Sequence, residues 1–163
     1  MAKLMAMANI DRIVIHSTAT TPTQKAGYAE IRQWHVEENG WDDVGYHMGI
    51  NRDGGIWSGR HIDFEQEQVV MGAHAYPCNK NSIGIVLEGG CSRVYKTPAG
   101  ATIYDSDDNF TDIQKLNLAA LVKGLIARLQ EHGAGNIEVQ GHNELNPSKT
   151  CPGFDVQAWW QDV

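Results

Sequence analysis

Two histidines and one cysteine have the residue types and positions of a zinc site. His16 directly follows the strand-like run 10–15, His142 comes at the end of the strand-like stretch 137–140, and Cys151 comes nine residues later. Imidazole and thiolate are zinc ligands, and a catalytic zinc needs three protein ligands and one open position. From these spacings we expect a His, His, Cys zinc site that lowers the pKa of a bound water towards neutrality.

The same residues allow a different chemistry. Cys151 could act as a nucleophile with His142 as its base, in a metal-free cysteine peptidase. Lys149, two residues before the cysteine, is a cation that could act on a substrate in either case. Cys78 and Cys91 have no plausible ligand near them in the sequence, and we expect both to be ordinary packed thiols. Metal analysis distinguishes the two chemistries.

The elements that would position these residues form an α/β pattern. Apolar runs and turn residues predict one domain with a central mixed β-sheet flanked by helices. Strands are expected over residues 10–17, 44–51, 55–59, 68–74, 82–87 and 136–140, and helices over residues 23–38, 111–132 and 155–160. Thr111 is the expected N-cap of the longest helix, and residues 91–109 read as an exposed loop or small hairpin.

Length and charge restrict the classes of function. The 163 residues fit a single domain, which we place at residues 10–163 after a flexible leader, residues 1–9. The net charge of -7 disfavours direct binding to nucleic acid or to anionic lipid. The leader lacks the apolar core of a signal peptide, and no stretch has transmembrane length. We therefore expect a monomer that is made in the cytoplasm.

Five segments agree, in order and spacing, with one known family. They are residues 14–20, 30–35, 40–47, 81–85 and 149–155. Together they resemble the type 2 zinc amidases, the family that includes the animal peptidoglycan recognition proteins. The resemblance covers about residues 10–160 and implies that residues 10–163 are a zinc amidase catalytic domain with that family's fold. The sequence departs from the family mainly between residues 91 and 109.

The resemblance implies a reaction and a set of site residues. The reaction is hydrolysis of the amide between N-acetylmuramic acid and L-alanine in bacterial peptidoglycan. The implied ligands of one zinc ion per chain are His16, His142 and Cys151. Tyr46 and Lys149 are the implied catalytic residues. An ammonium group can stabilise the oxyanion that forms, and a phenol can donate a hydrogen bond or pass a proton.

The other histidines have plainer expected roles. His74 is expected to line the groove near the metal, either touching substrate or supporting a ligand. Strand alternation places His47 on the face opposite Tyr46, so a structural role is expected for it. We expect His35, His61 and His132 to lie at the surface or near a helix end.

The resemblance also suggests a biological setting. A compact amidase without a signal peptide fits a phage endolysin, which reaches the cell wall through a membrane opening made by a separate protein. Phage lysozymes in the family imply a possible second role, inhibition of a phage RNA polymerase through protein contacts and not through nucleic acid. Neither composition nor spacing supports that second role independently.

Overall fold

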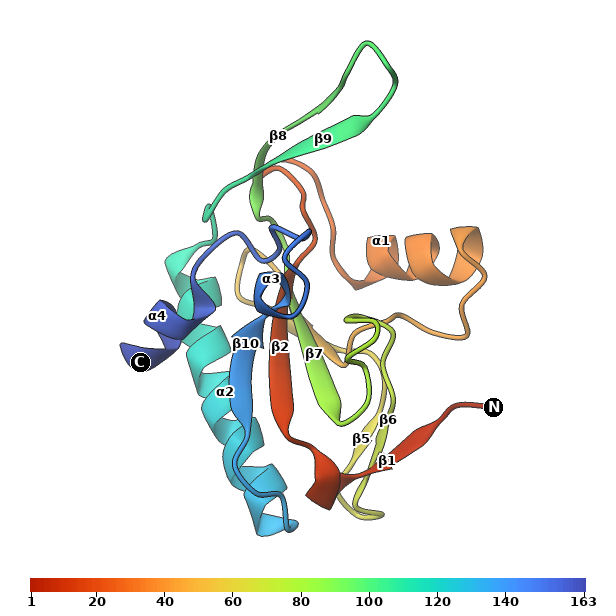
Figure 1. Cartoon of the computed structure of the whole chain (residues 1–163), viewed down its shortest axis with the longest axis vertical. Coiled ribbons are helices and arrows are strands. Elements are labelled where there is room, and N and C mark those ends of the chain that lie inside the picture. The colour runs from red at the N-terminus through yellow and green to blue at the C-terminus, as the bar shows by residue number, and fades with distance from the viewer.

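The core of the computed structural model, which describes residues 1–163, is a five-stranded mixed sheet (Figure 1). In spatial order its strands are β10 (Glu138–Gly141), β2 (Arg12–Ser17), β7 (Ser82–Leu87), β3 (Met48–Ile50) and β4 (Ile56–Ser58). All neighbours are parallel except the β3–β4 hairpin. Strand β7 is buried along its whole length, as expected for a parallel strand covered on both faces. The predicted α/β fold is confirmed.

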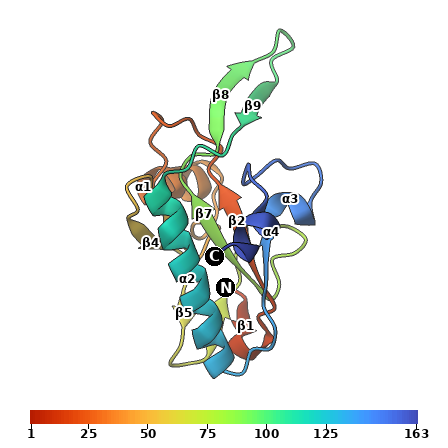
Figure 2. The same ribbon diagram turned by 90° about the vertical axis from the view of Figure 1, so that its left-hand side faces the viewer.

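The longest helix, α2 (Asp112–Glu131), covers one face of the sheet (Figure 2). It begins at the predicted N-cap: the Thr111 side chain accepts a hydrogen bond from the N–H of Gln114, and the Gln114 side chain accepts one from the N–H of Thr111. Its buried stripe recurs at helical spacing and packs against the strands. The stripe consists of Leu118, Val122, Leu125 and Leu129.

The other face of the sheet is covered by the first helix. This helix comprises α1 (Tyr28–Arg32) and a π-helical continuation, η2 (Gln33–Glu38). Ile31 packs there against Val86 of β7, whereas Ile85 belongs to the core under α2. Since side chains alternate along a strand, His16 of β2 shares the α1 face and Ile15 shares the α2 face. His16, the candidate metal ligand on β2, therefore lies on the α1 side of the sheet.

The first residues are part of the fold, which differs from the flexible leader that we predicted. Strand β1 (Leu4–Ala6) pairs with β6 (Gln68–Val70), which also pairs with β5 (Ile62–Asp63). A short 3-10 helix, η1 (Met7–Asn9), follows. Met5 and Met7 are buried in the main core, and this burial of two large apolar side chains holds the segment in place.

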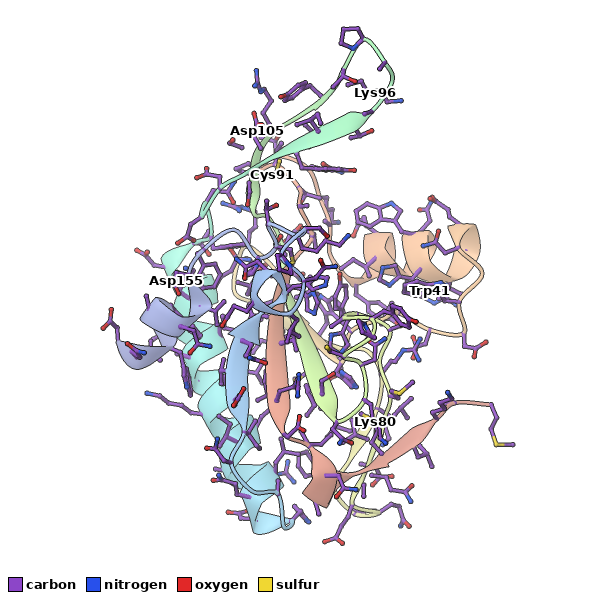
Figure 3. All side chains as sticks on the ribbon, in the orientation of Figure 1. Trp41, Lys80, Cys91, Lys96, Asp105 and Asp155 are labelled. Atoms are coloured by element: carbon purple, nitrogen blue, oxygen red, sulfur yellow. The ribbon has the colours of Figure 1, made fainter.

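The segment that departs from the family is a two-stranded hairpin. Its strands are β8 (Cys91–Lys96) and β9 (Thr102–Ser106), and it projects beyond the sheet in both views (Figures 1 and 2). Figure 3 shows Cys91 at the base of the hairpin and Lys96 near its tip. The predicted exposed loop or small hairpin is thus confirmed as a hairpin.

Several predicted boundaries were too wide. The first helix begins at Tyr28 and not at residue 23, because Gly27 is its N-cap and donates to Glu30. The predicted strand 44–51 is ordered as a strand only over β3, since the N–H of Gly45 donates to His35 and not to a neighbouring strand. Two short helices complete the chain, α3 (His142–Leu145) and α4 (Val156–Gln161). No helix has the length and apolar character needed to cross a membrane.

Candidate metal centre and active site

The three candidate ligands meet at the carboxyl ends of two adjacent parallel strands. Gly141, the last residue of β10, lies opposite Ile15 of β2, so the residue after each of them reaches the same edge. Those residues are His142 and His16, whose ring centroids are 4.7 Å apart. Cys151 returns to this edge from the loop after α3, and its ligand atom and those of the two histidines all lie within 4.8 Å of one another.

The donor set and its spacing fit a zinc ion. Tetrahedral zinc with ordinary Zn–N and Zn–S bond lengths places a nitrogen and a sulfur ligand about 3.6 Å apart. His16 Nδ1 and Cys151 Sγ are 3.8 Å apart. Two imidazoles and one thiol also leave one tetrahedral position for water or substrate, as in catalytic sites. The arrangement requires no fourth protein ligand.

Backbone contacts hold Cys151 at the site. The Ser17 N–H points at its sulfur, 3.1 Å away, and the Asn143 N–H donates to its carbonyl at 2.8 Å. Burial raises the pKa of the Cys151 thiol to about 11, while the contacts with Ser17 and the charge of Lys149 lower it. The cysteine is thereby connected both to β2 and to the start of α3.

His16 is oriented by a buried chain of hydrogen bonds. Its Nε2 lies 2.9 Å from Nδ1 of His74, and Nε2 of His74 lies 3.2 Å from Oγ of Ser82. The Ser82 hydroxyl donates to the carbonyls of Cys78 and Asn79, both at 2.9 Å. A metal on His16 Nδ1 leaves the proton on Nε2, which then donates to His74, and His74 in turn donates to Ser82. One tautomer of each ring satisfies every link.

His74 therefore lies behind His16 and not at an open groove surface. Only 8% of it is exposed, and burial lowers its pKa well below the ordinary value. Its place depends on Gly84 of β7, where an added Cβ would come within 2.6 Å of the imidazole ring. Of the two roles expected for His74, the geometry supports that of a partner holding a ligand.

Replacing His74 should weaken metal binding without unfolding the protein. We expect His74→Leu to lower zinc affinity by about 10- to 100-fold, because the Nε2 proton of His16 loses its acceptor. His74→Asn keeps an acceptor oxygen near the position of Nδ1 and should retain most of the affinity. Competition with a fluorescent zinc chelator measures both variants. Equal affinity in wild type and His74→Leu would contradict the role.

Both predicted catalytic residues lie near this centre. The Tyr46 ring is 5.2 Å from the His16 ring, and burial raises the pKa of its phenol, with the Cys151 sulfur adding to the effect. Lys149 is exposed on the loop between His142 and Cys151 and borders a surface cavity of about 630 Å³. Burial lowers the pKa of His142, and the charge of Lys149 adds to the effect. The Tyr46 phenol therefore keeps its proton at neutral pH and can donate a hydrogen bond.

Two supporting residues were not predicted. His35 is half-buried and not at the surface: its Nδ1 accepts from the Gly45 N–H at 2.9 Å, and its ring lies 4.6 Å from that of Trp41. This contact holds the loop that carries Tyr46, and the only signal for it is the shared helix face of residues 31–35. The Glu144 carboxylate accepts from the Gly141 N–H, which fixes the start of the helix that carries His142.

His47 has the structural role that strand alternation predicts. Its Nε2 donates to the Val70 carbonyl at 2.8 Å, and its Nδ1 accepts from the Gly84 N–H at 3.0 Å. Burial lowers the pKa of His47 to about 4, with a further contribution from the charge of Arg60. The other surface predictions are confirmed, since His61 and His132 pair with Asp63 and Glu67 near the surface.

The depressed pKa of His47 predicts that acid destabilises the fold. As pH falls below 6.5, the unfolded chain binds a proton that the folded chain takes up only near pH 4. The stability from neutral His47 is therefore complete above pH 6.5 and is lost as pH falls to 4, a difference of about 3 kcal/mol. Urea unfolding across this range should show a shallower pH dependence for His47→Gln. Identical slopes would contradict the assignment.

Comparison with known proteins agrees with this geometry. The family model described as N-acetylmuramoyl-L-alanine amidase matches residues 6–154. The endolysin of Escherichia phage T7 is 40% identical over 151 residues, which cover 93% of this chain and 85% of the relative. The endolysin of Enterobacteria phage T3 is 38% identical, with coverage of 94% and 87%. The structure of bumblebee PGRP-SA has the same fold, with a TM-score of 0.70, 23% identity and coverage of 99% and 86%.

Proposed function

The chain belongs to the N-acetylmuramoyl-L-alanine amidase family, and on that premise we propose that it is a zinc-dependent phage endolysin. It hydrolyses the amide bond between N-acetylmuramic acid and L-alanine in peptidoglycan. The observation that supports zinc as its cofactor is the meeting of two imidazoles and one thiol at the edge of the sheet.

In this proposal His16, His142 and Cys151 hold one zinc ion per chain. When bound, zinc supplies Lewis acidity that polarises the substrate carbonyl and lowers the pKa of a water in the open position. His74 keeps His16 in the tautomer and orientation that ligation requires. All of these groups come from one chain, so a monomer is sufficient for the site.

The chain's own residues stabilise charge as the amide carbon becomes tetrahedral. Lys149 places an ammonium group where it can stabilise the developing oxyanion, and its position on a surface loop lets it reach substrate. The Tyr46 phenol, kept protonated by burial, donates a hydrogen bond to the oxyanion or passes a proton to the leaving amine of L-alanine. In these roles Lys149 and Tyr46 contact the substrate beside the metal, and neither of them binds the metal.

The biological role follows from the relatives. Both phage proteins described above are endolysins, and we propose the same use here: synthesis in the host cytoplasm and action on the wall after a separate protein opens the membrane. Inhibition of a phage RNA polymerase remains a prediction, since no contact or surface described above favours it. A transcription assay with the phage polymerase would test that role.

Product analysis on purified peptidoglycan tests the proposed function. We expect new amino groups of L-alanine without new reducing sugar ends, because the amide and not the glycosidic bond is cleaved. About one zinc per chain should be found, and activity should be lost to a chelator and restored by zinc. Full activity of metal-free protein would instead support the Cys151–His142 peptidase.

A further inference from the structure

A second cavity lies where the loop after β2 meets the β8–β9 hairpin. It has a volume of about 370 Å³. Three segments line it: the loop after β2, the π-helical end of the first helix, and the hairpin. Its lining residues are Thr18, Ala19, Thr20, Gln24, Trp34, Val94 and Tyr104. We call it the hairpin cavity.

The hairpin cavity and the metal centre are built on the same chain segment. Thr18 lies two residues after His16 on the same segment, and Ser17 between them contacts the sulfur of Cys151. The loop after β2 is also fastened to the base of the hairpin, because the N–H of Cys91 donates to the Thr20 carbonyl at 3.2 Å. A ligand in the cavity would therefore be held at a fixed place relative to the ligands of the metal.

Only one face of the hairpin borders the cavity. Val94 pairs with Tyr104 across the two strands, so their side chains share a face, and both line the cavity. Tyr95 pairs with Ile103 and therefore lies on the opposite face, where Arg93 lies over its ring at 4.4 Å. Tyr104 is 51% exposed, which leaves much of this side chain free to contact a ligand.

The chemistry of the lining selects among the parts of peptidoglycan. No lining residue is charged: the walls present aromatic and aliphatic side chains together with hydroxyl groups and one amide. A sugar ring matches this set, since its C–H faces pack on the rings of Trp34 and Tyr104 and its hydroxyl or N-acetyl groups can bond to the Gln24 side chain. The peptide part ends in a carboxylate, which would favour a cationic partner.

We propose that the hairpin cavity binds a sugar ring of the peptidoglycan glycan strand, with Tyr104 and Val94 as its hairpin wall. The inference rests on the proposed function, because it assumes peptidoglycan as the substrate. The volume lies at the small end of ligand sites, about 300 to 1,000 Å³, and suits one or two sugar rings. The hairpin then selects for the glycan, while the metal centre performs the hydrolysis.

Steady-state kinetics on a soluble disaccharide-peptide fragment of peptidoglycan tests this assignment. Tyr104→Ala should raise KM by about tenfold and leave kcat nearly unchanged, because it removes apolar contact with a part of the substrate remote from the scissile amide. Tyr95→Ala, a tyrosine of the same hairpin on its other face, is the matched control and should behave as wild type. Both residues are exposed, so folding should be preserved in both variants.

Binding to separated parts of the substrate identifies the ligand. Calorimetric titration with a peptide-free glycan tetrasaccharide should show about tenfold weaker binding for Tyr104→Ala than for wild type, while titration with the sugar-free stem peptide should not distinguish them. An unchanged KM, or a loss confined to the stem peptide, would overturn the inference. Failure of the proposed function differs from both, because wild-type protein would then release no L-alanine amine from the fragment.

Discussion

Cys151→Ser is expected to lose its bound zinc and about 10³-fold or more of its amidase activity. A serine hydroxyl stays protonated near neutral pH and is a poor zinc ligand, so only the two histidines would hold the ion. Elemental analysis after dialysis measures zinc per chain, and release of L-alanine amino groups measures activity. Circular dichroism checks that the variant is folded.

Cys78→Ser is the matched control for this experiment. Cys78 is also a free, partly buried cysteine, but it lies outside the group formed by His16, His142 and Cys151. It should keep one zinc per chain and wild-type activity. His142→Ala should reproduce the loss seen in Cys151→Ser, because it removes a different ligand of the same ion. A Cys151→Ser protein that retains both metal and activity would refute the assignment of the ligands.

Tyr46→Phe is expected to lower kcat by about 100-fold while zinc stays bound. The substitution removes only the hydroxyl and keeps the ring against His16 and His35. The substitution removes the Tyr46 hydroxyl, which is a hydrogen-bond donor. Because burial raises its pKa, this hydroxyl is protonated across the whole working pH range. Single-turnover kinetics on a soluble muropeptide separates this effect on chemistry from an effect on binding.

Tyr28→Phe serves as the control for the tyrosine substitution. Tyr28 lies at the start of the first helix, and its ring centroid is 5.3 Å from that of Trp57 and not beside His16. Its kcat should match wild type. If Tyr46→Phe instead raised KM alone, Tyr46 would be a binding residue. If it released zinc, its role would be to support the ligands.

The sequence predicted that His16, His142 and Cys151 lie together, but it did not predict what surrounds them. His16 lies near the end of β2 and His142 directly follows β10, so their meeting at one edge needed only that the two strands be parallel neighbours. The family predicted from five ordered segments is confirmed by the match over residues 6–154. The link from His16 through His74 to Ser82 joins segments far apart in the chain, and no local pattern specifies such a contact.

The wrong predictions for residues 1–9 and for His35 also arise from contacts between distant parts of the chain. Residues 1–9 carry no strong periodicity, and the order of the segment depends on Met5 and Met7 reaching a core made by later parts of the chain. His35 looked like a surface residue because a helix pattern does not reveal that Gly45, ten residues later, returns to donate a hydrogen bond to it. Local propensity sets the elements, whereas tertiary contacts decide which polar groups are buried.

The hairpin leaves and rejoins the body of the protein at almost one point. The N–H of Asp107, just after β9, donates to the carbonyl of Gly90, just before β8, at 3.0 Å. A segment whose two ends are tied together can grow, shrink or be exchanged without altering the sheet that supports it. A change in the hairpin would therefore alter one wall of the hairpin cavity, while the strands that carry His16 and lead to His142 keep their register.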